Sequence, residues 1–159
     1  MSAWIELLRW MHVVGACVLL GTGAGIAFFM LMAHRTRNPA IIAHVTGTVV
    51  LADWLFTTSA VVIQPLTGFA LAHAIGWEIR TPWILLSLSL YVLTGLCWLP
   101  VVWIQIRLRL LAKEADASGG ILPQEYHRLF RIWLILGFPA FASVLAIVWL
   151  MLTKPDLTF

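Results

Sequence analysis

The stretch Trp4–Ala33, WIELLRWMHVVGACVLLGTGAGIAFFMLMA, decides the class of this protein. Its charged residues, Glu6 and Arg9, both lie near its start. A helix of about 20 apolar residues crosses the hydrocarbon core of a bilayer, so the stretch predicts a transmembrane helix. His12 lies inside it, and because lipid cannot hydrate an imidazole, this side chain is expected to face protein, water or a ligand.

The composition of the whole chain extends the same prediction. Of its 159 residues, 62% are hydrophobic and 11% are charged, whereas soluble domains have about 45–50% apolar and about 25% charged residues. At about 20 residues a span, there is room for about four transmembrane helices and for no separate soluble domain. We therefore expect residues 1–159 to form a single transmembrane domain. The net charge of +3 comes from basic residues at the ends of apolar runs, which suits lipid headgroups and not nucleic acid.

Four apolar runs follow one another along the chain. Proline early in a helix and glycine after its end mark the boundaries, as in the turn HRTRNP at 34–39 and in the Ser-Gly-Gly segment at 118–120. The prediction is an all-α integral membrane bundle of four antiparallel transmembrane helices, at approximately 5–33, 45–74, 82–112 and 124–152. The third helix is expected to continue beyond the membrane as a basic amphipathic extension. Prolines inside the last three runs are expected to bend them, at Pro65, Pro100 and Pro139.

The basic residues predict the orientation of the bundle. Seven lie on the side of the first turn and of the connection between the third and fourth runs: Arg35, Arg37, Arg107, Arg109, Lys113, Arg128 and Arg131. Three lie on the other side: Arg9, Arg80 and Lys154. Because cytoplasmic loops carry the excess of lysine and arginine, both termini are expected outside the cytoplasm, an N-out and C-out topology.

A first candidate site lies near the outer side. His12 is about two turns into the first run, and His73 lies at the outer end of the second. Arg9 shares a helix face with His12, and Arg80 lies at the same membrane edge. A b-type haem between helices needs such a set, with a neutral imidazole on the iron and arginines for the propionates. His12 and His73 are therefore candidate axial ligands, and Arg9 and Arg80 are candidate propionate partners.

Each of these histidines also has a structural interpretation. His12 could be a hydrogen-bonded packing residue. His73 could extend its ring to the membrane interface, and it points away from the polar face of its helix unless the bend at Pro65 rotates it. Met151, at the outer end of the last run, is an alternative axial ligand.

A second candidate site lies in the second run, toward the inner side. Asp53 is the only carboxylate well inside an apolar run, and because an unpaired buried carboxylate is costly, it is expected to be neutral or paired. Arg131, at the start of the last run, is the favoured partner. At about 100° per residue, one stripe of this helix is expected to face the bundle interior, formed by Asp53, Thr57, Ala60, Gln64 and Gly68.

Two interpretations of these polar residues remain open. An ion pair between Asp53 and Arg131 would lock the second helix against the last, or it would be half of a proton or substrate path. Gln64, beside Pro65, could contact a quinone, a porphyrin or an ion at mid-membrane, or it could form an interhelical hydrogen bond.

Other residues carry weaker signals. Gly21 and Gly25 form a G-x-x-x-G pattern, which allows a neighbouring or partner helix to approach closely. Cys17 and Cys97 lie inside apolar runs without metal-binding spacing and are expected to pack. The histidines at the inner edge come from different segments and also lack the spacing of a metal site: His34, His44 and His127.

Four stretches carry a resemblance to a known family: LLRWMHVVGACVLLGTGAGIAFFMLMAHR, TVVLADWLFTTSAVVIQPLTGFALAH, CWLPVVWIQIRLR and YHRLFRIWLILGFPAFA. They resemble a family of small bacterial inner-membrane proteins with a domain of unknown function, which implies a multi-pass protein of the bacterial plasma membrane. More distantly, the chain is similar to HemJ-type protoporphyrinogen IX oxidases and to CopD-like membrane domains, through its four-span layout and through Leu7, Leu8, His12, His34 and the closing Lys154-Pro155. The HemJ-type proteins bind haem b, which the resemblance implies for His12.

The leading hypothesis is a haem b-binding membrane redox protein that exchanges electrons with a quinone, a porphyrinogen or a small oxidant. If it is an enzyme, it is a membrane oxidoreductase. One alternative is a small ion or metal transporter that uses the stripe of Asp53 and Gln64, with copper favoured by the CopD likeness. Another is a structural membrane subunit that docks a partner helix, or a second copy of itself, at Gly21 and Gly25. Membrane lipid is an expected partner in every case.

Overall fold

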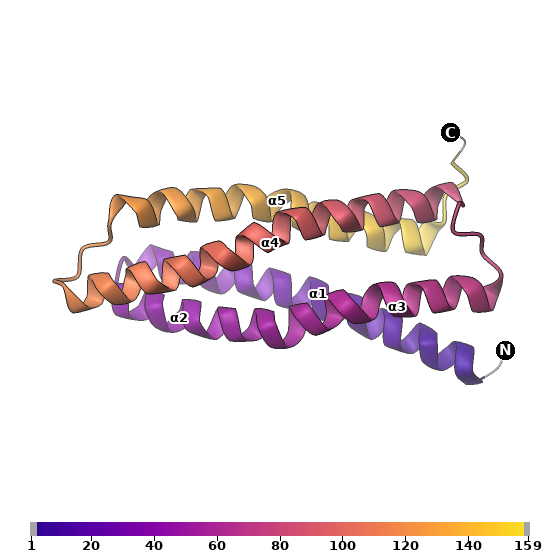
Figure 1. The fold of residues 1–159 in the computed structure, drawn as a ribbon, viewed down its shortest axis with the longest axis horizontal. Coiled ribbons are helices and arrows are strands. Elements are labelled where there is room, and N and C mark those ends of the chain that lie inside the picture. The colour runs from indigo at the N-terminus through magenta and orange to yellow at the C-terminus, as the bar shows by residue number, and fades with distance from the viewer. Residues whose placement is uncertain (1–2, 158–159) are drawn as a thin grey trace.

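The computed structural model describes residues 3–157, and within that range its regular elements are all helices. They are α1 (Ala3–Thr36), α2 (Pro39–Ala52), the π-helical turn η1 (Asp53–Thr57), α3 (Thr58–Ile75), α4 (Pro82–Ala117) and α5 (Gln124–Thr153) (Figure 1). Because α2, η1 and α3 follow without a break, they form one long helix. The described chain thus has four helices that are long and apolar enough to cross a membrane, which confirms the predicted fold class.

Helix α2 begins earlier than the apolar pattern predicted, at Pro39 and not near residue 45. The side-chain oxygen of Asn38 accepts hydrogen bonds from the backbone N–H groups of Ala40 and Ile41. An asparagine cap followed by proline starts a helix whatever the hydropathy of the next residues. The first turns of α2 are therefore specified by the turn that precedes them.

The turn between α3 and α4 is short. Gly76 ends α3 in the left-handed conformation, with φ at 81°, and the N–H of Trp77 donates to the carbonyl oxygen of Ala72 at 2.8 Å. Such a glycine cap satisfies carbonyl groups that the last helical turn leaves free. Pro82 then begins α4, which continues without a break to Ala117 and so includes the stretch expected to form the amphipathic extension.

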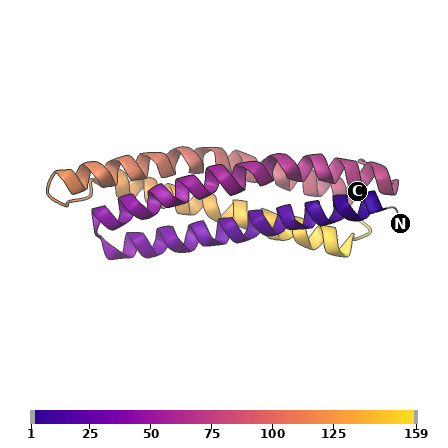
Figure 2. The same cartoon turned by 90° about the horizontal axis from the view of Figure 1, so that it is seen from below.

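The bundle has two ends, which differ in how tightly they pack. The terminal end holds both termini and the α3–α4 turn, and the basic end holds the α1–α2 turn and the α4–α5 connection (Figures 1 and 2). In the described chain, the small terminal cluster consists of Trp83, Ile84 and Leu150. The main core lies toward the basic end and draws on all four spans: Ile26, Met30, Ala33, Ile42, Ala43, Val49, Val101, Ile104, Leu108, Leu111, Ala112, Tyr126, Phe130 and Trp133.

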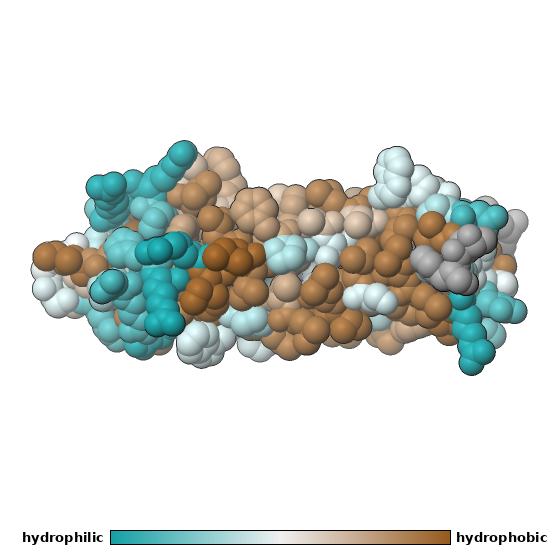
Figure 3. Space-filling view, turned by 90° about the horizontal axis from the view of Figure 1, so that it is seen from above, coloured by the Kyte–Doolittle hydropathy of each residue, from teal (hydrophilic) through white to brown (hydrophobic). Residues whose placement is uncertain are grey.

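A belt of exposed apolar side chains lies between the two ends. In Figure 3 the hydrophobic residues occupy the middle of the molecule, and the hydrophilic residues gather at both ends. Large residues such as Leu96, Phe138 and Trp149 are more than 60% exposed. Soluble proteins do not expose such a continuous belt, so its partner is the hydrocarbon of the bilayer.

The three internal prolines lie inside helices that continue past them: Pro65 in α3, Pro100 in α4 and Pro139 in α5. A proline lacks the N–H that would bond the carbonyl group four residues earlier. For Pro65 this is the carbonyl of Val61, and the hydroxyl of Tyr91 on α4 donates to it. The freed carbonyl group is thus satisfied by a neighbouring helix.

Candidate functional site

The polar stripe of the second span faces the interior of the bundle, as predicted. Asp53, Thr57, Ala60 and Gln64 are buried, and Gly68 is partly buried. The stripe holds two separate groups of polar contacts. Asp53 contacts Trp98 on α4, whereas Gln64 and Gly68 meet α1.

Asp53 begins the π-helical turn η1. The backbone N–H of Thr58 donates to the carbonyl oxygen of Asp53, and the hydroxyl of Thr58 donates to the same oxygen at 3.2 Å. A π turn inserts one extra residue into a helix, and such turns occur frequently at functional sites. In this turn, both Asp53 and Thr57 lie on the buried side.

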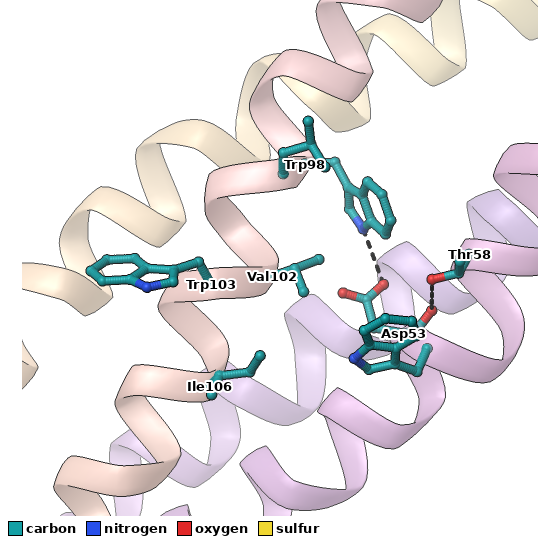
Figure 4. Close-up of a pocket in the computed structure, with 8 residues that line it drawn as sticks. Asp53, Thr58, Trp98, Val102, Trp103 and Ile106 are labelled. Atoms are coloured by element: carbon teal, nitrogen blue, oxygen red, sulfur yellow. Dashed lines mark hydrogen bonds between the residues drawn. The ribbon is translucent and has the colours of Figure 1, made fainter.

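The carboxyl group of Asp53 is incompletely satisfied. The indole N–H of Trp98 on α4 donates to Oδ1 at 3.2 Å (Figure 4). Oδ2 is buried without a hydrogen-bond partner in the described chain, and so is the hydroxyl oxygen of Thr57. A buried polar atom without a partner costs about 1–3 kcal/mol. Thr57 follows Asp53 by one helical turn, and its hydroxyl is close enough to the carboxyl group to interact with it.

The predicted ion pair between Asp53 and Arg131 is not formed. Arg131 is exposed, because the buried residues of its helical turn are Phe130 and Trp133. Within residues 3–157 the ion pair that the structure contains lies elsewhere: Nε of Arg107 and Oε1 of Glu125 are 2.9 Å apart. Asp53 and Arg131 were predicted to lie at a comparable depth along their helices, but Arg131 lies on the exposed face of α5.

Asp53 lies at the floor of a groove between the second span and α4. The groove has a volume of about 270 Å³ and is lined by Asp53, Trp54, Thr58, Trp98, Leu99, Val102, Trp103 and Ile106 (Figure 4). The side chains of Trp54 and Trp103 are 62% and 60% exposed, so they border the opening. The groove thus combines a polar floor with aromatic and aliphatic walls, and it opens on the lipid-facing belt.

The second group of contacts joins His12 to α3. Nδ1 of His12 lies 2.9 Å from the hydroxyl oxygen of Thr67, and the side-chain amide of Gln64 donates to the backbone carbonyl of His12 at 3.1 Å. A Cβ atom at Gly68 would lie 3.2 Å from Cε1 of His12, and one at Gly15 would lie 3.3 Å from Cδ of Gln64. The two glycines therefore allow α1 and α3 to pack closely around these polar side chains.

His73 does not join His12. It is five residues beyond Gly68, which places it about 7.5 Å farther along the axis of α3 and about 140° around it. It is exposed at the terminal end, in a separate groove of about 370 Å³ with Phe69, Trp77, Glu78, Ile79 and Arg80. The two histidines therefore do not form the pair that a bis-histidine haem requires. Arg9 is exposed on α1, and Arg80 lines the groove of His73.

Histidines at the basic end have structural contacts. The ring of His34 stacks on Phe130 with centroids 3.8 Å apart, and its Nδ1 lies 3.2 Å from the hydroxyl of Tyr126. These contacts join the end of α1 to the start of α5. Among residues 3–157, no three His, Cys, Asp or Glu side chains are grouped as a metal site would require.

The glycine pair, the two cysteines and Met151 differ in how far they contact the rest of the chain. A Cβ atom at Gly21 or Gly25 would meet no heavy atom within 4 Å, so the G-x-x-x-G face is not used by another helix of this chain. Cys97 is buried and Cys17 is exposed. Met151 packs against the small terminal cluster.

Four apolar helices with buried polar groups define an integral membrane protein of the helical-bundle class. Residues 6–155 match the model of a family described as "Predicted integral membrane protein (DUF2269)", and the chain belongs to this family. Comparison with curated proteins and with solved structures gives no match.

Sequence reasoning did not find the groove or the π turn. It also did not find the contact in which the indole of Trp98 points to Asp53. The signal for this contact was present, because a carboxyl group inside an apolar helix requires a donor and a tryptophan near the middle of α4 supplies one. No residue type specifies a π turn, so η1 had no comparable signal.

Proposed function

We propose that this protein binds a small lipid-soluble quinone or quinol in the groove over Asp53, as part of a membrane redox activity. The observation that carries the proposal is the carboxyl group of Asp53, because Asp53 lines a groove that opens to lipid and its Oδ2 has no hydrogen-bond partner in the described chain. A polar atom so placed is suited to the head group of a molecule that arrives from the bilayer.

The chemistry of the groove matches such a head group. Oδ2 of Asp53 accepts a hydrogen bond from a quinol hydroxyl as carboxylate and donates one to a quinone carbonyl as acid. Indole rings of Trp54 and Trp98 provide flat surfaces for an aromatic ring. The aliphatic wall of α4 leads the tail of the ligand toward lipid.

The size and the atoms of the groove favour a quinone over the other ligands considered from the sequence. Its volume of about 270 Å³ lies below the usual range of about 300–1,000 Å³ for drug-sized ligands, so it suits a single ring better than a porphyrinogen. None of its lining residues is Cys, Met or His. The soft ligands that copper prefers are therefore lacking at this groove.

A titration tests the proposal. Decylubiquinone is added to the purified protein in nanodiscs, and its affinity is measured by quenching of tryptophan fluorescence. Asp53→Leu should weaken binding by about 10- to 100-fold, because a hydrogen bond to a charged group contributes about 1.5–3 kcal/mol. Ser59→Ala, which removes an exposed hydroxyl outside the groove, is the control. Unchanged affinity in Asp53→Leu would refute the assignment.

Haem b binding at His12 is a second proposed function, favoured by the orientation of the ring. The hydroxyl of Thr67 donates to the carbonyl of Ile63 at 2.8 Å and so accepts from Nδ1–H of His12. This tautomer leaves the lone pair of Nε2 for a metal, as in many ligating histidines. Arg9, on the same face of α1, would pair with a propionate. The group would supply one-electron transfer.

An absorption spectrum tests the haem proposal separately. The detergent-purified protein should have a Soret band, either as isolated or after haem is supplied. His12→Ala should abolish or strongly shift it, and His73→Ala, on another side of α3, should leave it unchanged. A protein without this band after haem addition does not bind haem.

We further propose that the protein lies in the bacterial inner membrane with both termini outside the cytoplasm. The support is the asymmetry of charge between the basic end, with seven arginines and lysines, and the terminal end, with three. The uncovered face of Gly21 and Gly25 favours a partner helix or a second copy there.

A further inference from the structure

Arg109 lies in a niche between α4 and α2 at the basic end. A Cβ atom at Gly47 on α2 would lie 3.1 Å from Nε of Arg109 and 3.2 Å from its Cζ. Any larger residue would displace the guanidinium group. The missing side chain of Gly47 is therefore what lets the guanidinium lie against the backbone of α2.

No acceptor in the described chain satisfies this guanidinium. Its Nε is buried without a hydrogen-bond partner. One turn deeper on α4, Gln105 is 1% exposed and its Oε1 also lacks a partner among the described residues. The neighbouring Arg107 differs, because Nε and Nη2 donate to the carboxylate of Glu125 at 2.9 and 3.2 Å. Arg109 is thus a partly buried cation that lacks an anion.

The position of Arg109 indicates where such an anion would come from. The apolar run of α4 ends at Ile106, and Arg109 is three residues farther, about 4.5 Å along the helix axis. From the end of this apolar run we infer that Arg109 lies at the level of lipid headgroups. Val102 and Ile106, which line the groove, lie on the same face of α4 as Arg109. An acyl chain can therefore follow the apolar face while its headgroup meets Arg109.

We propose that the niche of Arg109 and Gly47 binds the phosphate group of an anionic phospholipid. A guanidinium presents a planar fork of donors that matches phosphate oxygens, and burying a cation without a partner is unfavourable. Free inorganic phosphate has the same chemistry. The lipid is favoured as its source because the apolar face continues from the niche. This proposal does not depend on ligand binding at Asp53.

Thermal unfolding of the whole protein in a neutral detergent tests the proposal. Added phosphatidylglycerol should raise the melting temperature of the wild type, and phosphatidylcholine should not. Arg109→Gln should lose the response to phosphatidylglycerol. Arg128→Gln, which removes an exposed cation at the same end, should keep it. Arg109→Gln is expected to fold, since without lipid it only removes a cation that lacks a partner.

Further outcomes decide the source of the phosphate and the role of charge. Gly47→Val keeps the charge but fills the niche, so it too should lose the response. The proposal would be overturned if phosphatidylglycerol raised the melting temperature of Arg109→Gln as much as that of the wild type. It would also be overturned if Arg128→Gln lost this response as fully as Arg109→Gln. A full response to millimolar inorganic phosphate alone would overturn the assignment to lipid and identify the free anion as the ligand.

Discussion

At the scale of single residues, Asp53 combines burial with an unpaired oxygen. A purely structural aspartate inside a membrane helix is expected to have both oxygens satisfied. The indole N–H of Trp98 donates to Oδ1 of Asp53, whereas Oδ2 has no hydrogen-bond partner within residues 3–157, and Asp53 lines a groove. This difference is the reason to regard Asp53 as a binding residue, in addition to its packing role.

Replacing Trp98 by phenylalanine should lower the stability of the protein in detergent by about 1–3 kcal/mol, because the carboxyl group of Asp53 loses its donor. In an Asp53→Leu background the same change should cost much less, since the acceptor is also gone. Melting curves by circular dichroism measure both. Trp103→Phe, which alters an exposed indole, is the control. Equal losses in both backgrounds would argue against the pairing.

The burial of these residues was easier to predict than their partners. Helical periodicity depends only on neighbouring positions, and it correctly placed Asp53 and Gln64 on one buried stripe. Trp98 is 45 positions from Asp53, and the contact depends on how two helices are rotated about their axes. Arg131 was the stronger electrostatic partner, but rotation of α5 turns it outward. Hydropathy does not determine such rotations.

At the scale of helices, the second span contains two interruptions of its regular hydrogen bonds. In η1 the hydroxyl of Thr58 donates to the carbonyl of Asp53, and before Pro65 the hydroxyl of Tyr91 donates to the carbonyl of Val61. Side chains thus compensate both interruptions, as they must at membrane depth. The proline could be predicted from its residue type, whereas the π turn could not.

Tyr91→Phe should destabilise the protein by about 0.5–1.5 kcal/mol, the net value of one hydrogen bond. In a Pro65→Ala background the loss should vanish, because the new N–H at position 65 bonds the carbonyl of Val61. Chemical or thermal unfolding of the single and double variants checks this coupling. A loss that persists with Pro65→Ala would mean that the Tyr91 hydroxyl acts elsewhere.

Glycines on α1 and α3 should differ in their response to alanine. Gly68→Ala places a methyl group against His12, and overpacking costs about 1–3 kcal/mol. Gly21→Ala meets no neighbour and should gain up to about 1 kcal/mol of helix propensity. The melting temperatures of the two variants and of the wild type are measured in the same detergent. Similar effects of both changes would show that α1 and α3 are not closely packed at Gly68.

At the scale of the whole molecule, packing is concentrated at the basic end. The main core joins all four spans there, whereas the terminal end has a small cluster around Trp83. Hydropathy predicted the four spans, because their length and composition leave no other fold in a bilayer. It did not predict the unequal packing, which depends on side-chain contacts between distant segments.

The charge asymmetry predicts the orientation of the molecule in the cell. Alkaline phosphatase fused after residue 159 should be active, because it folds outside the cytoplasm, and a fusion within the α4–α5 connection near Gly120 should be inactive. Green fluorescent protein fused at the same two points should give the opposite pattern. The reverse result at both points would place the termini inside.

Photolabelling locates the ligand and tests the central proposal most directly. An azidoquinone is irradiated with the protein in nanodiscs, and labelled peptides are mapped by mass spectrometry. The label is expected on Trp54 or within residues 98–106 of α4. Excess decylubiquinone, added as a competitor, should reduce this labelling, and Asp53→Leu should lose most of it. Labelling spread evenly over the lipid-facing belt, or unchanged in Asp53→Leu, would contradict a quinone site at the groove.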